Sequence, residues 1–382
     1  MPSNYDVIVV GLGVTGSSAA VALARRGARV LGLDRWTPPH AWGSSHGDTR
    51  ISREAYYERP IYVPLVRRAR ELWEELEREA GGRLHVETGG LNIGLEGSEL
   101  VIGALASARE HGVEHEVLTA AEVRRRYPGL RLAEGNVAVL EPRAGVLFPE
   151  ACVAALHDRA RWVGARIEYE NRVEGWKSGV DGIEVTTERG RRHAGRLVLA
   201  AGPWLSALVP GLGLPLEVER QWTAWFGHDG SYVAADFPVT LWEFSTGAFL
   251  YSCPDVGFGL KVGYHHGGRV VDPERVDREV DLAELESLRA AVSELFPRVS
   301  GGAERARVCL YTNTPDHDFI VDLQPGDPRV VIASPCSGHG FKFGPALGEV
   351  VADLVLAGGT SFDVRPFRLD RFARLGVQES SR

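Results

Sequence analysis

Lysine and methionine are nearly missing from this sequence of 382 residues. Of its 43 lysine and arginine residues only Lys177, Lys261 and Lys342 are lysines, and Met1 is the one methionine. Because arginine serves wherever a generic cation is needed, a retained lysine is a candidate for a role that requires a compact, strongly hydrated ammonium. Lys177 lies in a polar stretch that predicts a solvated turn. Lys261 and Lys342 lie among glycine and aromatic residues, so we single them out.

Other features that the sequence lacks exclude several classes of ligand. The four cysteines, at positions 152, 253, 309 and 336, are far apart and show no metal-ligand spacing, so no metal is expected. No run approaches about 18 uncharged apolar residues, and the start lacks the basic residues of a signal peptide. We therefore expect a cytoplasmic protein without a membrane partner. The net charge of −8 gives no reason to expect nucleic acid, which leaves small molecules as ligands.

The N-terminal segment predicts a dinucleotide-binding unit. The apolar run 7–10 is typical of a buried parallel strand, residues 17–26 of a helix, and residues 28–33 of a second strand. Between the first strand and the helix lie, in order, Gly11, Gly13 and Gly16. The three glycines alone are weak evidence and also occur in glycine-rich turns of unrelated α/β folds. Their register with both strands and the helix favours the dinucleotide interpretation.

Each residue of this unit has an expected physical role. Gly11 permits the tight turn, Gly13 lets a pyrophosphate approach the backbone at the helix N-terminus, and Gly16 allows close packing of the helix. Asp34 ends the second strand, where its carboxylate is placed to accept hydrogen bonds from a ribose. We therefore assign all four residues to a cofactor site.

The rest of the chain predicts an α/β protein, α+β overall: a Rossmann-like domain with an inserted, mainly antiparallel β domain. Helices are expected over 64–80, over 148–163, over 346–356 and from the capping box of Thr119 and Glu122 to just before Pro128. Further strands are expected over 166–169, 196–199 and 330–333, with short antiparallel strands through about 215–311. The cofactor domain is predicted to comprise 1–85, 145–215 and 312–370, the substrate domain 86–144 and 216–311, and a C-terminal tail 371–382. The active site is expected between the two domains.

Six segments, in the same order as in a known family and spread over nearly the whole chain, carry a resemblance. They are residues 7–16, 43–53, 259–265, 308–312, 318–322 and 337–342. Together they resemble the monomeric sarcosine oxidase family of flavoenzymes, relatives of N-methyltryptophan and pipecolate oxidases. The resemblance implies FAD rather than NAD as cofactor, bound through a cysteine thioether to the flavin 8α methyl. It also implies oxidation of a secondary or cyclic amino acid to an imine that hydrolyses to amine and aldehyde, with O2 reduced to H2O2 by a monomeric enzyme.

The resemblance also implies roles for individual residues. Cys309 matches the flavin attachment site, Lys261 the oxygen-activating lysine, and Arg53 and Lys342 the cations that bind the substrate carboxylate. The other catalytic candidates that it implies are His46, Arg50, Tyr251 and His265, and Gly338 belongs to the substrate loop. The other cofactor contacts that it implies are Ser44, Thr49, Val173, Gly202 and Gly340.

The residues by themselves leave alternatives open. Cys309 alternates with apolar neighbours like a buried strand thiol, Lys261 is compatible with a solvated strand edge, and the loop 43–53 with a salt-bridged surface loop. At the level of function, the rivals are a non-covalent D-amino acid or glycine oxidase, an NAD-dependent dehydrogenase and a flavoprotein without catalysis. Cys336 adjoins the Gly338 loop where the family commonly has a bulky apolar residue, which predicts a reshaped pocket.

The motifs contain no paired carboxylates of the kind that general acid and base catalysis uses. Because hydride transfer needs a free amine lone pair, we expect activity to rise with pH as the bound ammonium loses its proton. Two cations aimed at one site repel each other unless an anion bridges them, so we expect an anionic carboxylate in the substrate.

Overall fold

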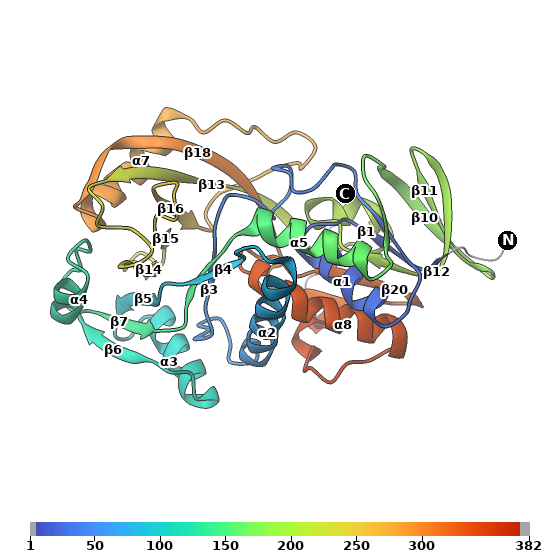
Figure 1. The fold of residues 1–382 in the computed structure, drawn as a ribbon, viewed down its shortest axis with the longest axis horizontal. Helices are drawn as coiled ribbons and strands as arrows, with labels where there is room; N and C mark the ends of the chain where they lie inside the picture. The colour runs from blue at the N-terminus through green and yellow to red at the C-terminus, as the bar shows by residue number, and fades with distance from the viewer. Residues whose placement is uncertain (1–4, 375–382) are drawn as a thin grey trace.

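The chain folds around two large β-sheets and one small one, in a computed structural model that describes residues 5–374 (Figure 1). The first sheet has the spatial order β10 (Val173–Gly179), β11 (Gly182–Thr187), β12 (Gly190–Leu199), β1 (Tyr5–Val10), β2 (Val30–Leu33), β9 (Arg166–Glu168), with β20 (Asp327–Ser334) paired to β12 and β19 (Ile320–Gln324) paired to β20. Its centre is parallel, because β1 pairs in parallel with β2 and β12, as do β2 with β9 and β12 with β20.

Helices cover one face of this parallel centre. They are α1 (Val14–Arg25), α2 (Tyr62–Ala80), α5 (Pro149–Trp162) and α8 (Gly344–Ala357). Figure 1 shows α1, in blue, beside α8, in red, so the two ends of the chain meet in one layer. Val7–Val10 are all buried, as expected of a parallel strand that is covered on both faces.

The second sheet is mainly antiparallel and forms the other half of the molecule. Its order is β17 (Arg269–Val270), β13 (Glu217–His228), β16 (Leu260–His265), β15 (Phe249–Cys253), β14 (Val239–Glu243), β5 (Gly90–Leu95), β7 (Asn136–Glu141), β6 (Glu116–Thr119), with β18 (Val299–Asn313) also paired to β13. The pair β14 and β5 is parallel. The accompanying helices are α3 (Glu99–His111), α4 (Ala120–Arg126) and α7 (Leu282–Leu295).

A small sheet and several short helical turns complete the described part. The small sheet has the order β3 (Arg50–Ser52), β8 (Gly145–Leu147), β4 (His85–Glu87). The turns are η1 (Gly202–Trp204), α6 (Leu205–Leu208), η2 (Pro210–Leu212), η3 (Phe341–Phe343), η4 (Arg365–Phe367) and α9 (Arg371–Arg374). Of the predicted tail 371–382, residues 375–382 lie outside the described part. The boundaries of the two domains stay predictions.

The expected fold class is confirmed, and most predicted elements occur within a few residues of their expected limits. The capping box of Thr119 and Glu122 is present in both directions at the start of α4. Helix α1 begins at Val14, three residues earlier than expected, so Gly16 lies inside it. A Cβ at Gly16 would lie 1.8 Å from the carbonyl oxygen of Gly11, and this close approach of helix and turn requires glycine.

Candidate active site

A cavity of about 570 Å³ lies where the two large sheets meet, and it collects nearly all the predicted site residues. Its wall is built from the loop after β1, the loop 43–53, strands β15, β16 and β18, and the loop before α8. Every candidate residue named from the sequence lines it except Gly16, which is packed inside α1 against the Gly11 turn. Sequence positions as distant as Gly11 and Lys342 therefore share one space.

One end of the cavity has the features expected for a dinucleotide. Gly11 adopts a φ of +88°, and helix α1 has no side-chain cap from its N-cap residue Gly13 and no acidic residue in its first turn. Such a helix N-terminus favours a bound pyrophosphate. The Asp34 carboxylate accepts the N–H groups of Leu12 at 2.7 Å and Trp36 at 2.9 Å. Asp34 therefore also holds the glycine turn in place, a role that its position in the sequence did not indicate.

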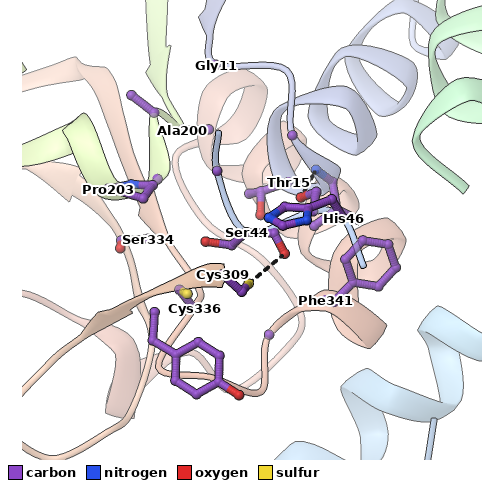
Figure 2. Close-up of a pocket in the computed structure, with 18 of the residues that line it drawn as sticks. Gly11, Thr15, Ser44, His46, Ala200, Pro203, Cys309, Ser334, Cys336 and Phe341 are labelled. Carbon is purple, nitrogen blue, oxygen red and sulfur yellow. Dashed lines mark hydrogen bonds between the residues drawn. The ribbon is translucent and has the colours of Figure 1, made fainter. Parts of the chain in front are cut away.

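The middle of the cavity exposes polar groups without partners. Among the described residues, buried polar atoms of five side chains on its wall have no hydrogen-bond partner. They are both ring nitrogens of His46, Oγ1 of Thr49, Oδ1 of Asn171, Nε1 of Trp204 and Oγ of Ser334. Figure 2 shows the His46 and Ser334 side chains on opposite sides of Cys309, around the same cavity as Gly11 and Ala200. Since buried polar groups are normally hydrogen-bonded, these atoms fit a ligand that carries many donors and acceptors.

His46 is neutral in this environment. Burial, together with the nearby charges of Arg50 and Lys261, lowers the pKa of His46 to about 3. A neutral imidazole donates one hydrogen bond and accepts another, so His46 offers a ligand both functions.

Lys261 is buried and points into the cavity from β16. Its ammonium is 2.8 Å from the carbonyl oxygen of Gly47 and 2.9 Å from that of Thr49, to which it donates. It also lies over the ring of Trp225, 5.4 Å from its centre. Burial and the charge of Arg50 lower the pKa of Lys261 to about 8. The alternative of a solvated strand edge is therefore wrong for this lysine.

Arg50 and Cys309 form a second contact across the cavity. The Arg50 guanidinium donates to the carbonyl oxygen of Ser44 at 2.8 Å and lies 3.5 Å from the Cys309 sulfur. Figure 2 shows the Cys309 sulfur facing the Ser44 carbonyl, to which the thiol donates a long hydrogen bond of 4.0 Å. Cys309 is partly exposed to the cavity, so it is not a fully enclosed strand thiol.

Arg53 has a counter-ion that the sequence analysis missed. Its guanidinium donates to both carboxylate oxygens of Glu58, at 2.7 and 2.8 Å, and its carbon lies 4.2 Å from the centre of the Tyr56 ring. Arg53 and Lys342 are therefore not two unbalanced cations, as the sequence suggested. A carboxylate five residues after a buried arginine is a signal from which this pair could have been predicted.

Lys342 is held by a chain of hydrogen bonds with a defined direction. The His339 Nε2 atom lies 3.0 Å from the His317 carbonyl oxygen, so Nε2 carries the proton and Nδ1 is the acceptor. The Tyr56 hydroxyl therefore donates to His339 Nδ1, at 2.7 Å, which leaves its oxygen free to accept from Lys342 at 3.4 Å. Lys342 also donates to the His339 carbonyl oxygen at 2.8 Å.

The remaining candidates close the cavity near these cations. Tyr251 and His265 line it beside Tyr311, whose hydroxyl lies 3.4 Å from the His265 Nδ1 atom. Burial holds the pKa of His265 well below its ordinary value. Gly338 has a φ of +77°, and a Cβ there would approach the Tyr311 ring to 2.5 Å. Tyr311 was missed, although it lies two residues after Cys309 on the same face of β18.

The fold and the cavity define a class of protein: an oxidoreductase in which a dinucleotide-binding unit and a second, mainly antiparallel sheet line one cavity. The chain belongs to the family described as FAD dependent oxidoreductase, whose model matches residues 6–354. The cofactor is accordingly FAD, and the NAD-dependent alternative is set aside. The orphaned polar atoms of His46, Thr49, Trp204 and Ser334 fit such a group.

Two curated relatives and one solved structure illustrate the similarity. A monomeric sarcosine oxidase from Streptomyces avermitilis is 40% identical over 380 residues, 98% of this chain and 99% of that protein. An N-methyl-L-tryptophan oxidase from Salmonella heidelberg is 35% identical, over 97% of this chain and 100% of that protein. The open form of NikD, described as an unusual amino acid oxidase essential for nikkomycin biosynthesis, is similar with a TM-score of 0.83 at 27% identity, over 96% of this chain and 98% of that chain. The family resemblance predicted from the sequence is confirmed.

Two further expectations concern metals and membranes. Within residues 5–374 no group of histidine, cysteine and carboxylate side chains is arranged to hold a metal ion. In the same part of the chain no helix is both long and apolar enough to cross a bilayer.

Proposed function

We propose that this enzyme oxidises an amino acid with an N-methyl, N-alkyl or ring nitrogen, giving an imine that hydrolyses to amine and aldehyde or stays cyclic, with O2 reduced to H2O2. The observation that carries the proposal is one cavity that joins a dinucleotide site to Lys261 and to the Arg53, Glu58 and Lys342 cluster. The chemistry supplied by bound FAD is acceptance of a hydride from the C–H bond next to nitrogen and two-electron reduction of oxygen. The test is an oxygen-consumption screen over N-substituted amino acids.

The charges at the substrate end favour an anionic group. Below pH 7, Arg53 and Lys342 contribute two positive charges and Glu58 one negative charge, so one positive charge of these three side chains stays unbalanced. A substrate carboxylate neutralises it, and the planar guanidinium of Arg53 suits two parallel hydrogen bonds to that group. The carboxylates that line the cavity, Asp34, Glu174, Glu188 and Glu274, lie on the first-sheet segments and on the segment after β17. None of these four carboxylates lies at the substrate end, so we expect the substrate amine to lose its ammonium proton before oxidation without help from a carboxylate base.

The Tyr56 hydroxyl provides a specific test of the carboxylate site. Burial, and then the charge of Arg53, lower the pKa of Lys342 to about 7, so its ammonium is charged below pH 7 and is lost above it. We expect KM to rise with pH through about 7, while kcat rises as more substrate amine is deprotonated. Tyr56→Phe keeps the ring against Arg53 but removes the acceptor that stabilises the Lys342 ammonium.

In Tyr56→Phe, the rise of KM should therefore begin at lower pH, with KM about 5- to 10-fold higher at pH 7 and kcat nearly unchanged, the scale of one ordinary hydrogen bond. Steady-state kinetics from pH 6 to 9 measures both parameters. Tyr169→Phe, which removes a hydroxyl bound to His157 away from the cavity, is the control. An unchanged KM profile in Tyr56→Phe would show that the hydroxyl does not act on Lys342.

We further propose that FAD is attached covalently at Cys309. Cys253 and Cys336 also line the cavity, but burial raises the pKa of both thiols. The Cys309 sulfur faces the cavity and lies 3.5 Å from the Arg50 guanidinium. Forming the thioether replaces the S–H bond and one C–H bond of the 8α methyl by a C–S bond. The two electrons and two protons released pass through the flavin to oxygen, which leaves as H2O2.

Cys309→Ser should release all of its flavin on acid precipitation, whereas the wild-type pellet should stay yellow. Peptide mass mapping of the wild type should place the adduct on the peptide with Cys309, and Cys336→Ser is the matched control. An adduct at Cys336, or a colourless wild-type pellet with yellow supernatant, would contradict the assignment. The second outcome favours the non-covalent D-amino acid or glycine oxidase alternative.

The substrate specificity within this class, the oligomeric state and the cellular location stay predictions. The relatives include both sarcosine and N-methyltryptophan oxidases, and the substrate screen distinguishes these and a pipecolate-type specificity. We expect a monomer, because several relatives are named monomeric, and size-exclusion chromatography tests this. Cytoplasmic location and the lack of nucleic-acid or membrane partners are expectations from the sequence.

A further inference from the structure

A segment of the second-sheet half of the molecule crosses to the dinucleotide end of the cavity. It comprises residues 271–281, between β17 and α7, and is here named the clasp. In Figure 1 it is the light orange chain that runs from α7 across the top of the molecule toward the blue N-terminal part. Nothing in the motifs of the sequence indicated a role for it.

Two charged side chains of the clasp bind the loop that follows β2. Glu274 accepts from Arg35 at 2.6 Å and lies 3.6 Å from Arg172. Arg278 donates to the carbonyl oxygens of Ala41 and Trp42, at 2.9 and 2.7 Å. The contacts with Arg35, Ala41 and Trp42 join parts of the chain that are more than 230 residues distant in sequence.

The backbone of the clasp is also held by a side chain of the second sheet. Arg220 of β13, only 2% exposed, donates to the carbonyl oxygen of Asp277 at 2.8 Å and to that of Glu279. Its guanidinium also pairs with Glu284 in the first turn of α7, at 2.6 Å. A buried arginine that binds two backbone carbonyls holds the clasp in one conformation. Glu274 and Arg278 are therefore kept against the loop that follows β2.

The surface under the clasp fits an adenosine. Trp36 packs against Trp42, with ring centres 5.8 Å apart and nearly parallel, and against Trp204 at 4.8 Å. Trp36, Trp204 and Glu274 all line the cavity on the side of Asp34, and the indole N–H of Trp204 is buried without a partner in the described part of the chain. Aromatic faces beside an unpaired donor and the Asp34 carboxylate suit a stacked base with its sugar.

We propose that the clasp closes the adenosine end of the FAD site, so that Glu274 and Arg278, from the substrate domain, retain the cofactor of the other domain. This inference requires only that the chain binds FAD and is independent of the proposed amine oxidation. Release of the adenosine moiety then requires the contacts of the clasp with Arg35, Ala41 and Trp42 to break. Cofactor binding is thereby coupled to the association of the two large sheets of the molecule.

The test uses the full chain with Cys309→Ser, because a covalent bond would hide weaker binding. Dissociation constants of FAD, ADP and FMN are measured by calorimetry for the parent, Glu274→Gln, Arg278→Ala and Arg275→Ala. Arg275 lies in the same segment but is 87% exposed and contacts Asp272 only at 3.9 Å, so it is the matched control. We expect Glu274→Gln and Arg278→Ala each to weaken FAD and ADP about 5- to 10-fold, the scale of one partly exposed charged contact, and to leave FMN unchanged.

Equal affinities in the clasp variants and Arg275→Ala would overturn the proposal, and so would equal weakening of FMN, since that shows a general loss of structure. If the Cys309→Ser chain does not fold, the same substitutions are made in the wild-type holoenzyme. Phosphodiesterase should then release AMP from the bound flavin faster in Glu274→Gln and Arg278→Ala than in Arg275→Ala. The same rate in all three would overturn the proposal.

Discussion

Lys261→Met is expected to slow the reaction of the reduced enzyme with oxygen by about 10²–10³-fold, while anaerobic reduction by substrate stays comparatively intact. The buried ammonium is a fixed positive charge in the cavity, and negative charge develops on oxygen as it takes up electrons. Because the environment excludes water, the attraction is much stronger than at a surface. Stopped-flow absorbance of the flavin measures the two half-reactions separately.

Two controls separate the charge of Lys261 from its structural role. The ammonium also holds the carbonyls of Gly47 and Thr49, so methionine leaves both without that donor. Lys261→Gln keeps an N–H donor without the charge and should be nearly as slow as Lys261→Met. Lys177→Met removes an exposed lysine, paired with Glu184, and should behave like the wild type. Slow reduction with normal reoxidation would refute the assigned role.

The pH dependence gives an independent check of the same residue. Burial lowers the pKa of Lys261 to about 8, so its charge is present below pH 8 and is lost as the pH rises through that value. The wild-type reoxidation rate should therefore fall above pH 8, and this fall should be absent in Lys261→Met.

Removing the negative charge of the substrate is expected to cost about 2–5 kcal/mol in kcat/KM, the range for leaving a buried charge without its partner. The comparison is between an N-methyl amino acid and its amide or ester at matched pH. Lys342→Met is the better protein variant, because truncating Arg53 would leave the Glu58 carboxylate alone in a mostly buried site and would impair folding.

Removing the substrate charge and substituting Lys342→Met should not have additive effects if the substrate carboxylate binds Lys342. In Lys342→Met, the difference between the acid and its ester should shrink by about 1 kcal/mol or more, as for groups in direct contact. Equal turnover of the acid and the ester by the wild type would overturn the carboxylate site. A full difference retained in Lys342→Met would assign the carboxylate to Arg53 alone.

Features that depend on neighbouring residues could be predicted from the sequence. The turn at Gly11, the packing of Gly16 and the capping box of Thr119 and Glu122 follow from backbone geometry and hydrogen bonds within a few residues. The alternation of Cys309 with apolar neighbours indicated a strand there, and the structure has this residue in β18. The start of α1 was misplaced by three residues, because helix propensity counts against Gly16 whereas its packing on the turn favours it.

The sequence by itself determined the class of fold, the dinucleotide unit and, through its motifs, the set of residues around the cavity. Only the tertiary structure decided what the charges contact at a distance along the chain: the carbonyls of Gly47 and Thr49 on Lys261, and Glu274 on Arg35. Lys261 and Gly47 are 214 positions apart, and Glu274 and Arg35 are 239 apart. Secondary structure and glycine turns arise from short-range sterics, whereas the partner of a buried charge depends on how distant elements pack and on which groups lose water together.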